Sequence, residues 1–132
     1  MTQRIPPDSW TDPRHRAGLE AEAIAAEWLT ARAWTVVESR YRLGHHDLDL
    51  IVRRGSLVAF VEVKWRATNV FGAPEEAIGH RKRRVIEQVG WAWILRHGQP
   101  ADQYRFDVIA MSGPLERCRI RHIEDAWRPA WR

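Results

Sequence analysis

Two apolar runs decide the fold of this chain: His45-His46-Asp47-Leu48-Asp49-Leu50-Ile51-Val52 and Leu57-Val58-Ala59-Phe60-Val61-Glu62-Val63-Lys64-Trp65-Arg66, joined by Arg53-Arg54-Gly55-Ser56. Both runs are rich in β-branched residues, and the polar joint contains a glycine, which together predict a β-hairpin. The second run is apolar on both alternating faces from Leu57 to Val61. It therefore predicts an interior strand of a sheet.

Charged side chains appear where the second strand ends. Glu62 and Lys64 are two residues apart and project from one face, as Asp47 and Asp49 do on the partner strand. Two buried carboxylates about 4 Å apart repel by roughly 4 kcal/mol at an effective dielectric near 20. A divalent cation bound between them makes the net electrostatic interaction attractive. Asp49, Glu62 and Lys64 therefore form a candidate site for Mg²⁺ or Mn²⁺. The alternative is a simple ion pair of Glu62 with Lys64 where the strand reaches solvent.

Composition favours one folded intracellular domain. The chain has 132 residues, is 45% hydrophobic and 29% charged, and carries a formal net charge of +4, which favours polyanionic partners such as nucleic acid or an anionic membrane surface. The single cysteine, Cys118, excludes an internal disulfide framework and a cysteine-cluster zinc site. No apolar run is long enough to span a membrane, and no signal peptide is recognisable, so we expect a cytoplasmic protein that does not bind membranes.

The first part of the chain predicts an arm, a helix and a strand. Residues 1–13 contain three prolines and no periodicity, which is typical of a flexible N-terminal arm. A helical stripe follows from about Arg16 to Ala33, with Glu22 at the border of its apolar face. A short strand is expected from Thr35 to Glu38.

The second half predicts a helix and two more strands. The helix should run from Pro74 to about Arg96 with a stripe that contains Lys82, whose ammonium must then snorkel outward or meet an anion. Strands are expected at 104–111 and 119–123, and a closing helical turn at 124–127. The order α-β-β-β-α-β-β predicts an α/β domain over residues 14–127, with a mixed central β-sheet flanked by helices and a basic C-terminal tail at 128–132.

Short motifs occur in order along this framework: Gly18-x-x-Ala21-Glu22, His46-Asp47-Leu48-Asp49-Leu50-Ile51, Phe60-Val61-Glu62-Val63-Lys64-x-Arg66, Phe71-Gly72, Lys82, Arg105-Phe106-Asp107-Val108-Ile109 and His122-Ile123. The helix with a glutamate, the strand with an aspartate and the strand with E-x-K resemble the PD-(D/E)XK nuclease superfamily, in particular archaeal Holliday junction resolvases. More closely, the chain resembles the YraN family of bacterial predicted endonucleases, over about residues 16–127. Each motif alone is a weak signal, and their common order and spacing make a strong one.

The resemblance implies a restriction endonuclease-like core and a Mg²⁺- or Mn²⁺-dependent endonuclease that hydrolyses phosphodiester bonds in DNA, with branched or repair and recombination intermediates as candidate substrates. It implies that Asp49 and Glu62 are metal ligands, that the carbonyl of Val63 is a third, that Lys64 positions the attacking water and that Glu22 is a supporting acid. The basic residues expected to hold the nucleic acid backbone are Arg40, Arg42, Arg66, Arg81, Lys82, Arg83 and Arg84.

Three positions depart from the family pattern: Ala21 and His46 replace glycines, and Asp47 replaces a glutamate. None of them removes an implied ligand. The main alternative function is a catalytically inactive module with the nuclease fold that binds DNA or a protein partner, and a further one is a metal-free interaction protein. Because the junction-cutting relatives act as dimers, a homodimer is a further hypothesis.

Overall fold

The computed structural model describes residues 13–68 and 78–131, with side chains described from Arg16 onward. The predicted N-terminal arm, apart from Pro13, and the predicted helix start at Pro74 lie outside the described residues, as does the Phe71-Gly72 motif. In the described ranges, no helix combines the length and the apolar character that crossing a lipid bilayer requires.

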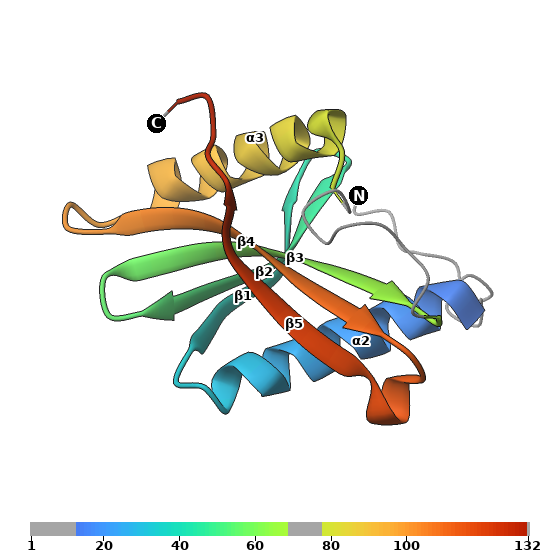
Figure 1. The fold of residues 1–132 in the computed structure, drawn as a ribbon. Coiled ribbons are helices and arrows are strands. Elements are labelled where there is room, and N and C mark those ends of the chain that lie inside the picture. The colour runs from blue at the N-terminus through green and yellow to red at the C-terminus, as the bar shows by residue number, and fades with distance from the viewer. Residues whose placement is uncertain (1–12, 69–77, 132) are drawn as a thin grey trace, which may run out of the picture.

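Five strands form one mixed sheet in the order β1-β2-β3-β4-β5, and the two helices pack on its opposite faces (Figure 1). β3 and β4 run parallel, and the other neighbouring pairs are antiparallel. The predicted α/β class and the order α-β-β-β-α-β-β are confirmed. The elements are α2 (Pro13–Thr30), β1 (Thr35–Leu43), β2 (His46–Arg54), β3 (Leu57–Arg66), α3 (His80–His97), β4 (Gln103–Ser112), the 3-10 turn η2 (Leu115–Arg117) and β5 (Arg119–Trp127).

The core has two halves, one on each face of the sheet. On the α2 side, Ala21, Ala25 and Leu29 of the helix pack on buried residues of β2, β3 and β4. On the α3 side, the helix packs on an aromatic layer that includes Phe60 of β3 and Phe106 of β4. The middle strand β3 is buried on both faces, as its continuous apolar run predicts.

A close approach fixes the position of α3. Gly90 faces the aromatic layer, and a Cβ atom at this position would lie 3.3 Å from ring atoms of both Phe60 and Phe106. Those two rings are fully buried and lie 5.1 Å apart between centroids. The glycine therefore lets the helix backbone lie directly on the aromatic layer.

The first helix ends three residues earlier than its apolar pattern predicts. Ala33 adopts a left-handed φ of 71°, and the N–H of Trp34 donates to the carbonyl of Leu29, which closes the helix in the manner of a Schellman motif. Glycine usually occupies the left-handed position, so an alanine there gives no sequence signal for a helix end. Trp34 is thereby folded back into the core.

The prediction for α3 is wrong in its first turn and right only in part for its stripe, in which Val89 and Trp93 are buried as expected. Ile78 and Gly79 are not helical, and the buried residues of the helix are Ile86, Val89, Gly90 and Trp93. Lys82 is exposed, because this stripe is rotated away from it.

Two strands are longer than predicted. β1 continues past Glu38, where the predicted strand ends, as far as Leu43. β5 continues to Trp127, which pairs with Phe106, so the predicted closing helical turn at 124–127 is wrong. After β5 the chain remains packed, since Trp131 contacts the α3-side core.

Candidate active site

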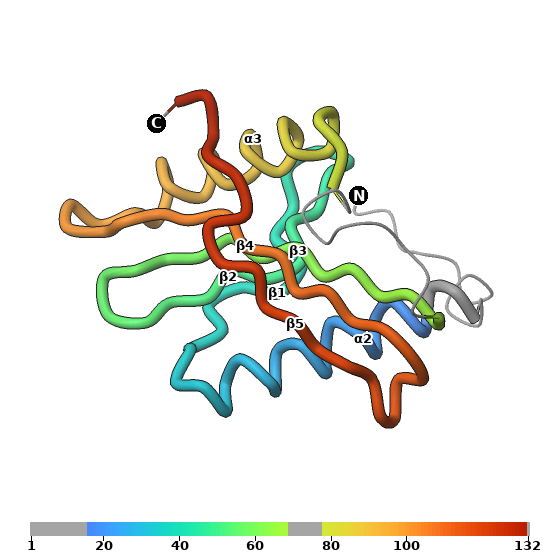
Figure 2. Tube along the Cα trace, viewed as in Figure 1, coloured from blue at the N-terminus to red at the C-terminus, as the bar shows by residue number. Residues whose placement is uncertain are grey.

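The candidate site lies where β2 separates from β3. The antiparallel pairing of these strands runs from Arg54↔Leu57 to Leu50↔Val61. Beyond that point, the teal end of the β1–β2 hairpin turns toward the start of α3, while the green β3 continues toward the start of α2 (Figure 2). The two strands thus form a fork, and Asp49 and Glu62 lie at its base.

Each carboxylate at the base of the fork replaces a ladder bond of the sheet. The backbone N–H of Asp49 donates to Glu62 Oε1 at 3.2 Å, and the backbone N–H of Val63 donates to Asp49 Oδ2 at 2.8 Å. The two side chains are thereby held between the strands, with Glu62 only 3% exposed. Among the described residues, the remaining oxygens, Asp49 Oδ1 and Glu62 Oε2, form no further hydrogen bond.

An irregularity of the β1–β2 pair turns Asp49 toward this position. Leu48 packs in the α3-side core and Leu50 in the α2-side core, although residues two apart on a regular strand share a face. Arg40, directly across from Asp49 in the register, adopts a left-handed φ of 55°. Such a conformation costs a non-glycine residue roughly 1–2 kcal/mol, so the fold sustains local strain at the site.

Burial makes the two carboxylates hard to ionise together. Burial, followed by the negative charge of Asp49, raises the pKa of Glu62 to about 8. Burial also raises the pKa of Asp49, against the opposing effect of the hydrogen bond from Val63. A positive charge beside Asp49 Oδ1 and Glu62 Oε2 would offset the energetic cost of ionising both carboxylates.

Glu22 reaches the same cluster from α2. This half-buried carboxyl has its pKa raised to about 7, first by burial and next by the charge of Asp49, while Arg40 lowers it. Glu22 therefore lies within electrostatic range of Asp49. The structure brings Asp49 and Glu62 together through hydrogen bonds to each other's strands, whereas Glu22 is linked to them only by this charge interaction.

Two lysines approach the acid pair. Lys64, two residues after Glu62, lowers the pKa of both Asp49 and Glu62, and the ammonium of Lys82 on α3 lowers both pKa values more strongly. Lys82 is exposed and lies outside the apolar stripe, so its side chain reaches solvent, while its charge also acts on the acid pair.

The basic residues predicted to hold nucleic acid divide into three groups. Arg40 and Arg42 form ion pairs with Asp47 at 3.5 and 3.6 Å. Arg83 is half-buried, donates to the carbonyl of Ile78 and lies over the Trp127 ring, so it stabilises the packing of α3. The third group consists of the remaining members, which are all exposed: Arg66, Arg81, Lys82 and Arg84.

The donor set at the fork suits a hard divalent cation. Two carboxylate oxygens are available, and the Val63 carbonyl points to the β2 side of β3, because the N–H and C=O of one strand residue face the same neighbour. In residues 13–68 and 78–131 no three His, Cys, Asp or Glu side chains are grouped closely enough to hold an ion by themselves. An ion at this site would thus need the carbonyl and water as well as the acid pair, which is the coordination that Mg²⁺ prefers.

A second polar cluster was not predicted from the sequence. Asp107 is fully buried and accepts two hydrogen bonds from Arg105, one from the backbone N–H of Asp125, and shares a 2.7 Å contact with His122 Nε2. These bonds hold the pKa of Asp107 below its usual range despite burial. The two-residue spacing of Arg105 and Asp107 predicts that they share a face of β4. The sequence around them gives no signal that Asp107 contacts residues of β5.

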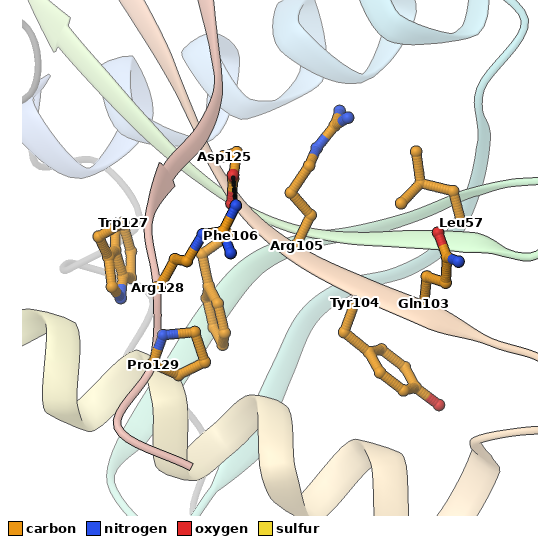
Figure 3. A pocket seen from close by; sticks show the side chains of 9 residues that line it. All are labelled: Leu57, Gln103, Tyr104, Arg105, Phe106, Asp125, Trp127, Arg128 and Pro129. Atoms are coloured by element: carbon orange, nitrogen blue, oxygen red, sulfur yellow. Dashed lines mark hydrogen bonds and ion pairs between the residues drawn. The ribbon is translucent and has the colours of Figure 1, made fainter. Parts of the chain in front are cut away.

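A cavity of about 260 Å³ lies at the β4–β5 edge of the sheet (Figure 3). Its charged side chains are already paired, Arg105 with Asp107 and Arg128 with Asp125. It contains none of the predicted catalytic residues. The residues that line it are Leu57, Gln103, Tyr104, Arg105, Phe106, Asp125, Trp127, Arg128 and Pro129.

Comparison with known proteins gives the chain a family. It is 34% identical over 116 residues to a UPF0102 protein of Anaeromyxobacter dehalogenans, which covers 88% of this chain and 87% of that one. It is 36% identical over 115 residues to a UPF0102 protein of Erythrobacter litoralis (86% and 94% covered), and 36% identical over 116 residues to one of Chlorobium chlorochromatii (83% and 89% covered). Residues 21–111, which include the whole fork and Lys82, match the family described as "Uncharacterised protein family UPF0102". The chain therefore belongs to the UPF0102 family, the YraN family that its motifs predict.

Proposed function

We propose that this protein is a metal-dependent endonuclease of the PD-(D/E)XK type that hydrolyses phosphodiester bonds in DNA. The observation that carries the proposal is the fork, where Asp49 and Glu62 are held by each other's strands and each keeps one oxygen without a hydrogen bond from the described part of the chain. The groups that this chemistry uses are two carboxylates, a backbone carbonyl and a lysine, and here they come from the neighbouring strands β2 and β3.

The residues of the fork have distinct roles in this reaction. Asp49 and Glu62, with the Val63 carbonyl, would hold Mg²⁺ or Mn²⁺. A bound divalent cation supplies Lewis-acid activation of water and of the scissile phosphate. Lys64 lies on the same face as Glu62 and places an ammonium where it can orient the attacking water and stabilise the charge that develops on the phosphate. Glu22 adds a supporting carboxylate at the edge of the site.

Cleavage and metal binding test the proposal separately. We expect the purified protein to cleave branched DNA with Mn²⁺, and Asp49→Asn and Lys64→Ala to lose at least about 100-fold of the rate. Mn²⁺ at ten times its Kd should stabilise the wild type by about 1.4 kcal/mol in thermal unfolding. Asp49→Asn should lose this stabilisation, whereas Lys64→Ala should keep or increase it, because that variant removes a competing positive charge.

Glu27→Gln is the matched control, since Glu27 is exposed on the same helix that carries Glu22. Equal cleavage by the wild type and both active-site variants would assign the activity to another site or protein. DNA binding without Mn²⁺-dependent stabilisation or cleavage would support the inactive binding module instead. Sedimentation of the wild type with and without a four-way junction tests the homodimer hypothesis.

A further inference from the structure

One face of α3 is exposed along its whole length. Residues that follow one another at alternating spacings of three and four lie on a single stripe of a helix. On α3 this stripe, here called the outer face, is exposed at every position: Arg81, Arg84, Gln88, Trp91 and Leu95. It is basic in its first half and apolar in its second, and it contains no carboxylate.

The charge of the whole protein is concentrated on this helix. α3 contains five Lys and Arg side chains and a single acid, Glu87, which gives it a formal charge of +4, equal to that of the entire chain. The carboxylate of Glu87 accepts a hydrogen bond of 2.9 Å from the Trp127 indole. The surface is therefore complementary to a polyanion.

A groove of about 410 Å³ joins the basic and aromatic parts of the outer face. It is lined by Arg84, Glu87, Gln88, Trp91, Ala130 and Trp131. Trp91 is 44% exposed, an unusual position for so large an apolar ring, and its centroid lies 5.1 Å from that of Trp131 at an interplanar angle of 47°. A base inserted between the rings would need about twice the 3.4 Å stacking distance. A base can therefore stack only on the outward side of Trp91, with Trp131 as its support.

We propose that the outer face of α3 binds a single-stranded segment of DNA, with phosphates at Arg81 and Arg84 and an unpaired base stacked on Trp91. Basic side chains that follow the backbone, combined with an aromatic platform, are the general means by which proteins hold single strands without reading their sequence. Seven residues separate Arg84 from Trp91, or roughly 10.5 Å along the helix. This distance corresponds to about three stacked nucleotides.

The position of the surface relative to the acid pair suggests its use. Lys82, next to Arg81 in the first turn of α3, acts electrostatically on both Asp49 and Glu62. A strand on the outer face would thus run away from the fork. Resting on the proposed nuclease function, this inference narrows the substrate class to DNA that carries a single-stranded arm of about four or more nucleotides beside the cleaved bond.

Binding in the absence of metal tests the surface independently of cleavage. The probe is a fluorescein-labelled oligothymidylate of about twelve nucleotides, followed by anisotropy in EDTA at several salt concentrations. Trp91→Ala should weaken binding about tenfold with an unchanged salt slope, and Trp91→Phe should restore most of the affinity. Arg84→Gln should reduce the salt slope by about 0.7. Leu19→Ala is the matched control, because Leu19 is an exposed apolar residue, at 38%, on the other helix, α2.

Two results would overturn the inference. One is wild-type affinity in a Trp91→Ala protein whose circular dichroism and melting temperature show that it is folded. The other is a wild-type dimer in sedimentation that both Trp91→Ala and Leu95→Ala dissociate, which would assign the face to a second copy of the chain. Trp91-dependent binding by a protein that never cleaves DNA would remove the nuclease proposal and leave the surface. If the protein cleaves DNA, does not bind the probe and is unaffected by Trp91→Ala, the binding surface on α3 is ruled out and the nuclease proposal stands.

Discussion

At the scale of single residues, Glu62 is the most informative position. It lies in a strand that is buried on both faces and is itself buried, yet among the described residues its carboxylate accepts a hydrogen bond only from the backbone N–H of Asp49 and forms no ion pair. Burial and the charge of Asp49 raise its pKa to about 8. A side chain that costs stability in this way is retained for what it binds or does, and a divalent cation is the simplest partner for it.

The raised pKa of Glu62 predicts how the stability of the metal-free protein depends on pH. Between the ordinary glutamate pKa of 4.5 and about 8, the folded state holds the proton whereas the unfolded state releases it. Stability is therefore fully present below pH 4.5 and is lost as the pH rises through about 8. Glu62→Gln should abolish this loss. We expect its free energy of unfolding, relative to the wild type, to increase by about 5 kcal/mol across this range of pH.

Urea denaturation in EDTA across this pH range measures the effect. Glu27→Gln, which removes an exposed carboxylate, should follow the wild-type curve. Addition of Mn²⁺ should flatten the wild-type profile, because a bound cation favours the ionised pair. Parallel curves for the wild type and Glu62→Gln would contradict the burial of an ionisable pair at the fork.

At the scale of elements, α3 is positioned by the absence of a side chain. Gly90 lies on the aromatic layer, and the Phe60 and Phe106 rings under it are packed against further aromatic residues, so they have little room to move. Gly18 on α2 is the opposite case, since a Cβ atom there would meet nothing within 4 Å. The same substitution on the two helices thus separates helix propensity from packing.

Gly90→Ala should destabilise the protein by about 1 kcal/mol, because overpacking costs of about 1–3 kcal/mol exceed the gain of about 1 kcal/mol in helix propensity. Gly18→Ala should stabilise it by up to about 1 kcal/mol, because only the propensity changes. Chemical denaturation of both variants at one pH checks the pair. A stabilised Gly90→Ala would mean that α3 can lift from the sheet without cost.

At the scale of the whole molecule, charge and candidate catalytic groups lie together. α3 accounts for the formal charge of +4, and its first turn lies beside the acid pair that we propose as the metal site. A polyanion is therefore drawn to the part of the molecule that holds the acids.

Paired arginine variants test this distribution with duplex DNA. The double variant Arg81→Gln and Arg84→Gln should reduce the slope of log K against log salt by about 1.8, if each side chain neutralises one phosphate. The double variant Arg117→Gln and Arg119→Gln changes the net charge equally at exposed positions in η2 and β5, and it should leave the slope unchanged. Equal effects of the two would indicate binding without a preferred surface.

The sequence by itself determined the features that local patterns encode. The continuous apolar run predicted that β3 is buried on both faces, and the two-residue spacing of Glu62 and Lys64 predicted their shared face at its end. The family resemblance implied that Glu22 and Asp49 belong to the same site, which stays a prediction; the charge of Asp49 acts on both glutamates. Hydrophobic periodicity works here because it reports which face of an element is buried.

Only the tertiary structure decided how the elements are placed against one another. An alanine in a left-handed conformation ends α2, and a fully buried aspartate from β4 keeps residues 124–127 in the sheet instead of a helical turn. The rotation of α3, fixed by contact with the aromatic layer, turns Lys82 out of the predicted apolar stripe and leaves Trp91 exposed. A local pattern can specify a face, but the register between faces depends on contacts between residues far apart in the chain, and these exist only in the folded protein.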